Sequence, residues 1–110
     1  MKVRTGFISN SSSTSFLITN TSNEIKTLVD FVEENPQLVE EFNVEYEASF
    51  TQKEMILDAK KKKLSFRPKV EKECTFGDDE GTIIGRVFDY ILRNGGESKS
   101  FTWEFYEWKR

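Results

Sequence analysis

Apolar residues recur with two different periods along this chain of 110 residues, and no other feature constrains the fold as strongly. Around residues 25–32 and 83–92 they return every three or four positions, the spacing that gives a helix one apolar face. Over residues 100–108 they alternate with polar residues, as in a strand with one buried face. Both periods in one short chain predict an α+β fold, with about three helices packed against a small sheet of three to five strands.

Local signals predict where the helices begin and end. The hydroxyl residues at 21–22 can cap a first helix, and Pro36 should end it. Thr51 and Glu54 have the spacing of a capping box, so another helix should follow Thr51. The apolar stripe at 83–92 should form a further helix, which the Asn-Gly-Gly sequence after it stops.

The expected extended segments are residues 15–20, 43–50, 64–67, 74–76 and 100–108. The first carries a continuous apolar run, which is typical of a strand covered on both faces. Residues 43–50 alternate in a way that favours a strand, although a helix continuing from Phe42 would also accommodate their acidic side chains. Residues 70–73 should form a charged turn, and the last strand should lie in the middle of the sheet with its alternate aromatic residues on one face.

Length and composition narrow the class of protein. The length suits one domain over residues 1–110, with residues 1–14 as an N-terminal arm or loop. A net charge of −3 gives no long-range attraction for nucleic acid, and the absence of histidine removes the usual general base and the commonest zinc ligand. One cysteine excludes an internal disulfide, and no apolar run is long enough for a signal peptide or a membrane span. We expect a cytoplasmic protein that has no cofactor and is not an enzyme.

A hydroxyl-rich stretch at residues 9–15 holds six Ser or Thr residues and one Asn between two short apolar runs. It is typical of a polar loop whose hydroxyls satisfy their own backbone. Alternatively, it could bind phosphate or another anion, or a protein partner could recognise it as an extended tag. The candidate binding residues are Arg4, Ser9, Asn10, Ser11, Ser12, Ser13 and Ser15.

The opening residues resemble those of small uncharacterised bacteriophage and bacterial proteins. Such proteins share a basic N-terminus followed by Gly-Phe-Val/Ile-Ser-Asn-Ser-Ser-Ser-x-Ser-Phe, which here covers Gly6 to Phe16, with Thr14 where serine is common. The segments at 77–82 and 99–108 also look like parts of phage proteins of this size. The resemblance implies a phage-encoded accessory protein in the cytoplasm of its bacterial host, and it implies no activity or catalytic residue.

Charged residues and the cysteine supply further candidates. Asp78, Asp79 and Glu80 could bind a divalent cation through their oxygens, but acidic residues before a helix are more typical of capping. The lysine run at 60–63 could contact phosphates, although a solvated helix end is the more common role of such a run. Cys74 has no neighbouring histidine, and we interpret it as a small core residue.

Aromatic residues near the end of the chain suggest a surface for a partner. Tyr106 and Trp108 share one face of the last strand and would form an apolar patch if that face is exposed. We therefore expect a non-enzymatic protein that binds a host or viral protein and that could form a homodimer through an aromatic strand face. The alternatives are an anion- or nucleotide-binding module that uses the hydroxyl-rich stretch with Arg4, and a divalent-metal enzyme that uses residues 78–80.

Overall fold

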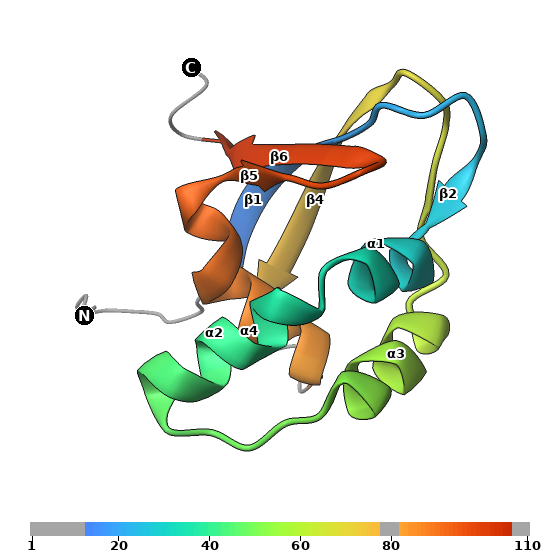
Figure 1. Ribbon diagram of the computed structural model, residues 1–110. Coiled ribbons are helices and arrows are strands. Elements are labelled where there is room, and N and C mark those ends of the chain that lie inside the picture. The colour runs from blue at the N-terminus through green and yellow to red at the C-terminus, as the bar shows by residue number, and fades with distance from the viewer. Residues whose placement is uncertain (1–12, 78–81, 107–110) are drawn as a thin grey trace.

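The computed structural model of the protein describes residues 13–77 and 82–106 (Figure 1). In chain order the elements are β1 (Ser13–Asn20), β2 (Lys26–Thr27), α1 (Leu28–Glu34), α2 (Pro36–Tyr46), α3 (Gln52–Lys61), β3 (Ser65–Phe66), β4 (Glu71–Gly77), α4 (Ile83–Ile91), the 3-10 turn η2 (Leu92–Asn94), β5 (Gly96–Glu97) and β6 (Phe101–Phe105). The described strands form an antiparallel sheet in the order β4-β1-β6-β5 and a separate pair, β2 with β3. The α+β prediction is confirmed, and each described helix is too short or too polar to span a bilayer.

Strand β1 lies inside the four-stranded sheet, between β4 and β6, and its apolar run is buried. Phe16 and Ile18 are fully buried, and Leu17, which points to the other face, is 8% exposed. Phe16 lies opposite Cys74 of β4 on one side and Phe105 of β6 on the other. The interior position of β6 is confirmed. The expectation of a strand covered on both faces holds on the second face only at Leu17, because Ser15 and Thr19 there are half-buried and the neighbouring Glu73 of β4 is exposed.

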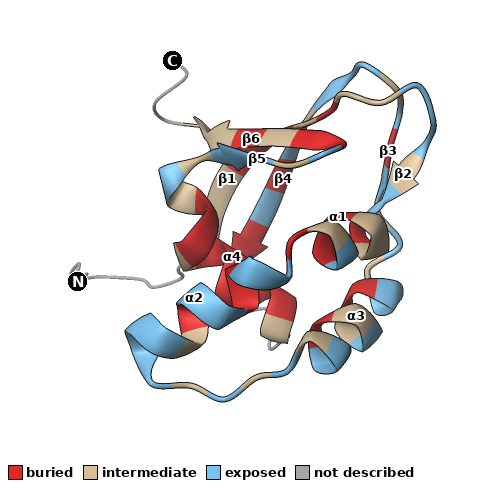
Figure 2. Ribbon diagram, in the orientation of Figure 1, coloured by how far each residue is buried: buried red, intermediate tan, exposed pale blue. Residues whose placement is uncertain are grey.

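An aromatic cluster centred on Phe31 of α1 joins the helices to the sheet. The Phe31 ring makes edge-to-face contacts with Phe88 of α4 and with Phe101 and Trp103 of β6, at centroid separations of 5.5, 5.0 and 5.1 Å. These are favourable geometries for ring quadrupoles. Figure 2 shows the resulting pattern, in which buried residues line the inner sides of α1, α4 and the strands while α2 and α3 expose their outer sides.

The first helix begins several residues later than predicted. Thr27 is its N-cap, and Thr27 and Asp30 form a reciprocal capping box. Ile25, which was expected on the apolar face of this helix, is 68% exposed and precedes β2. The prediction failed because Ser and Thr can cap a helix or stabilise a turn equally well, and here Ser22 bonds to Asn20 in a turn.

The strand predicted at residues 43–50 is wrong, because α2 continues to Tyr46. The rings of Phe42 and Tyr46, one helical turn apart, lie in a tilted contact with centroids 4.8 Å apart, and Val44 between them is 83% exposed. Glu47 then adopts a left-handed conformation with φ of 53°, and its N–H bonds back to the carbonyl of Asn43. The alternation in sequence therefore came from a helix whose outer face is acidic.

Two smaller differences concern β4 and α4. Residues 71–73, expected within a turn, belong to β4 and pair with β1, and the turn lies before them at Lys69, where φ is 63°. The N-cap of α4 is Thr82, whose hydroxyl accepts a hydrogen bond from the N–H of Gly85. Asp58 of α3 accepts from the N–H of Ile84 at 2.9 Å, so a carboxylate distant in sequence also stabilises this helix start.

Replacing Phe31 with alanine should lower the free energy of unfolding by about 3–5 kcal/mol, because it leaves a cavity facing three aromatic rings. Chemical denaturation followed by circular dichroism measures this change. Ile25→Ala, at an exposed position, is the control and should cost no more than about 0.5 kcal/mol. Equal effects of the two substitutions would contradict the central position of Phe31.

Candidate functional site

Only some of the predicted site residues lie in the part of the chain that the structure describes. Arg4, Trp108 and the ranges 9–12 and 78–80 lie outside the described residues, so the predictions that depend on them stay predictions. Ser13 begins β1. The Ser15 hydroxyl lies 3.2 Å from that of Thr75 on β4, and Tyr106 is half-buried directly after β6.

Strand pairing brings the described residues next to the hydroxyl-rich stretch, the acidic cluster and the C-terminal aromatic segment to one end of the sheet. Ser13 lies opposite Gly77, so the hydroxyl-rich stretch joins the sheet beside the point where the acidic cluster leaves it. Phe16 lies opposite Phe105, which places the start of the C-terminal aromatic segment on the other side of β1. Ser13, Gly77 and Phe105, the described residues that flank or begin these regions, thus lie at one end of the sheet.

A polar cluster that sequence reasoning missed lies at this same end. Asp89 of α4 is fully buried, and its Oδ1 accepts hydrogen bonds from the Thr14 hydroxyl and, at 3.0 Å, from Nη2 of Arg93. The Arg93 guanidinium also lies 5.3 Å from the Tyr90 ring and 5.9 Å from the Phe105 ring. Asp89 and Arg93 stand four residues apart beside the apolar stripe of α4. An acidic and a basic residue at this spacing can pair on a helix, so this spacing is the sequence signal that could have predicted the cluster.

The contacts of this cluster indicate a structural role. Arg93 donates from Nη2 to the Thr14 hydroxyl at 3.1 Å and from Nε to the carbonyl of Asp89 at 2.6 Å. The charge of the guanidinium is therefore balanced by a buried carboxylate, and the group ties the end of α4 to the first residues of β1. Removing Arg93, whose side chain is 41% exposed, would take a counter-charge away from the buried carboxylate of Asp89, and the cluster is therefore a clamp between helix and sheet.

A groove with an apolar floor lies between α1 and α3. Its volume is about 390 Å³, within the range of ligand pockets. The floor includes the buried Leu28 and Ala59 and the half-buried Val29 and Leu64. The lining residues are Thr27, Leu28, Val29, Ala59, Lys60, Lys63, Leu64 and Ser65.

Two exposed lysines give this groove a positive rim. Lys60 and Lys63 come from the run that was interpreted as a solvated helix end. Neither has an ion-pair partner within residues 13–77 and 82–106. Lys61 and Lys62 line a smaller pocket of about 180 Å³ beside Asp58, and Lys62 lies over the Phe76 ring at 5.6 Å. The fold therefore divides the lysine run between two sides of α3.

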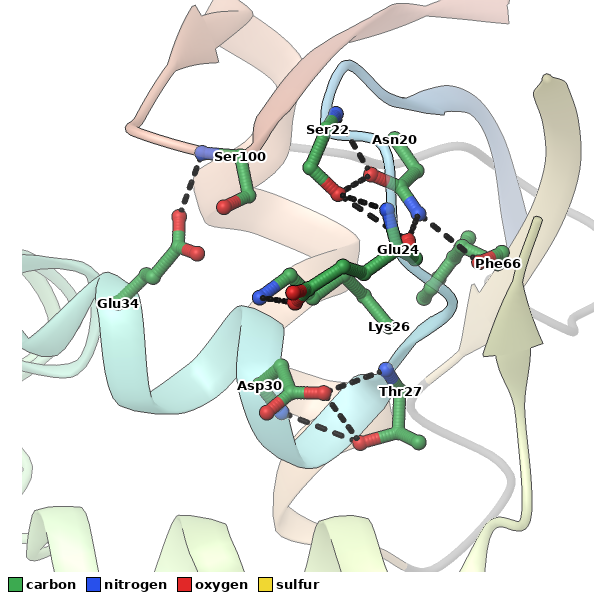
Figure 3. A network of polar contacts seen from close by, with 9 residues as sticks. All are labelled: Asn20, Ser22, Glu24, Lys26, Thr27, Asp30, Glu34, Phe66 and Ser100. Atoms are coloured by element: carbon green, nitrogen blue, oxygen red, sulfur yellow. Dashed lines mark hydrogen bonds and ion pairs between the residues drawn. The ribbon is translucent and has the colours of Figure 1, made fainter. Parts of the chain in front are cut away.

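Hydrogen bonds around Asn20 join β1 to β3, the strand whose Ser65 lines the groove (Figure 3). Asn20 is fully buried, and its amide donates to the carbonyls of Glu24 at 2.6 Å and Phe66 at 2.9 Å. Its Oδ1 accepts from the N–H and the hydroxyl of Ser22. At the start of α1, the N–H of Leu28 donates to the carbonyl of Leu64 at 3.0 Å. The groove is thus a preformed feature.

Glu34 connects the other end of α1 to the loop before β6. Its Oε1 accepts from the Ser98 hydroxyl at 2.8 Å and from the N–H of Ser100 at 2.9 Å. Burial raises the pKa of this carboxyl, but the hydrogen bonds from Ser100 and Ser98 outweigh burial and hold the pKa below its ordinary value of 4.5.

Cys74 is a core residue, as predicted, with 5% of its surface exposed. Burial is the main cause that raises the pKa of its thiol to about 11. Such a thiol is almost entirely protonated near neutral pH and is a poor nucleophile. Within residues 13–77 and 82–106, no group of three or more Cys, Asp or Glu side chains is placed to hold a metal ion.

The stabilising effect of Glu34 should depend on pH. Because the pKa of Glu34 is lower in the folded state, its contribution is complete above the unfolded value near 4.5 and is lost as the pH falls through the folded value. The stability difference between the wild type and Glu34→Gln should therefore shrink on acidification, as measured by denaturation at several pH values. Glu33→Gln removes the same charge at the exposed neighbouring position and is the control. A difference that grows at low pH would contradict this assignment.

The thiol of Cys74 should react slowly in the folded protein. At pH 8, raising the pKa from 9.0 to about 11 reduces the thiolate fraction about a hundredfold. The rate of reaction with a coloured disulfide reagent should fall at least that much relative to the same chain in denaturant. Equal rates in the two states would show that Cys74 is accessible.

No protein-family model matches this chain, and comparisons with curated proteins and with solved structures found no match. The resemblance of the opening residues to phage and bacterial proteins therefore stays a prediction.

Proposed function

We propose that this protein acts by binding a protein partner and not by catalysis, and that the groove between α1 and α3 is its docking surface. The observation that carries the proposal is the combination of an apolar floor with two lysines that lack ion-pair partners in the described ranges. An apolar floor supplies binding free energy, while unbalanced charges at a rim supply orientation and partner selection. The partner would present an apolar side chain flanked by acidic groups.

The rigidity of the groove supports this function. The Thr27–Asp30 capping box fixes the start of α1, and Asn20 joins β1, β3 and the segment before β2. A wall held by such bonds loses little conformational entropy when a partner docks. The resemblance of the opening residues to those of phage and bacterial proteins supports a bacterial cytoplasm as the setting of this binding, where a phage-type accessory protein would meet host or viral proteins.

Affinity capture from a bacterial lysate tests the proposal with a matched pair of baits. Lys60→Glu/Lys63→Glu reverses the rim charges, whereas Lys53→Glu/Lys99→Glu makes the same change in net charge at exposed lysines outside the groove. The wild type and the control should enrich a common protein at least about tenfold over the rim variant, because like charges facing each other cost several kcal/mol. Identical capture by the wild type and the rim variant, or no reproducible capture, would refute the proposal.

A further inference from the structure

Helix α2 carries an exposed apolar side chain surrounded by acidic ones. Val44 is 83% exposed, the most exposed of the large apolar residues described. Glu40 and Glu41 stand four and three residues before it and therefore lie beside it on the helix surface, and Glu47 is the left-handed C-cap at the end of the same helix. None of the three has an ion-pair partner in the described parts of the chain. The helix itself contains no lysine or arginine.

This face of α2 is complementary to the groove in charge and in its apolar centre. An apolar projection ringed by carboxylates corresponds to an apolar hollow rimmed by Lys60 and Lys63. The two surfaces cannot meet within one molecule, because α2 runs away from the α1–α3 groove toward the opposite side of the molecule (Figure 1). Complementary surfaces on separate sides of a molecule favour contact between copies.

We propose that the groove also binds a second copy of this chain, which inserts Val44 between Lys60 and Lys63. The carboxylates of Glu40 and Glu41 then face the two ammonium groups. The inference rests on the proposed function, because it gives the same groove a second occupant, and it implies that self-association and partner binding compete. The contact is head-to-tail, so it leaves a free α2 at one end and a free groove at the other and leads to short chains or a closed ring.

Sedimentation velocity over a range of protein concentrations tests this contact. At low ionic strength the wild type should form species larger than a monomer, with a population that rises with concentration. Raising the salt to about 1 M shortens the Debye length to about 3 Å and should weaken the association. A wild type that stays monomeric under all these conditions overturns the inference.

Two variants that each remove one half of the contact make the test specific. Val44→Glu puts a charge where an apolar side chain must be buried, and Lys60→Glu/Lys63→Glu reverses the rim. Each variant alone should be monomeric. Their equimolar mixture should form a 1:1 heterodimer, because the intact groove of the first can bind the intact α2 of the second. Val70→Glu, at another exposed valine outside the groove, should associate like the wild type.

The outcomes separate this inference from the proposed function. If Val44→Glu associates like the wild type, or if the mixture forms no heterodimer, α2 is not the occupant and the inference fails. Capture of a lysate protein that depends on Lys60 and Lys63 would still support the proposed function in that case. Circular dichroism spectra that match the wild type show that each variant is folded.

Discussion

The packing of Phe31 against rings from α4 and β6 is the contact on which the remaining arrangement depends. It is the point where the sheet, α1 and α4 meet, and its three edge-to-face contacts lie at 5.0–5.5 Å. Each such pair contributes about 0.5–1.5 kcal/mol beyond the area it buries. Because α1 is also one wall of the groove, the aromatic core fixes the geometry of the proposed docking surface.

Buried polar contacts then fix the orientation of the helices and strands that pack around the aromatic core. The buried amide of Asn20 uses both its donor and its acceptor atoms, and it joins segments 46 residues apart through the carbonyl of Phe66. Asp89 and Arg93 perform the corresponding task at the other end of β1, where they connect α4 to Thr14. Buried polar groups of this kind are costly when unpaired, so the hydrogen bonds of Asn20 and of Asp89 Oδ1 favour this arrangement over its alternatives.

Charge in this chain is segregated by helix. Helix α2 is acidic, whereas α3 ends in lysines, and the small net charge of −3 conceals this division. The lysines also complement the dipole at the end of α3. From the sequence, the lysine run cannot be distinguished from an ordinary solvated helix end. The difference is that Leu28, Val29 and Leu64 lie in the same groove as Lys60 and Lys63, which makes these lysines the rim of the proposed docking surface.

The sequence by itself determined the α+β class, the buried β1, the capping box at Thr51 and the inert core position of Cys74, because each depends on local periodicity or on side-chain chemistry. It did not determine where α1 begins or how far α2 extends, since Ser22 and Val44 suit two local structures equally well. Only the tertiary structure decided those ends, the Asp89–Arg93 clamp and the groove. Each of these requires residues distant in sequence to lie together, and that proximity is set by packing of the core.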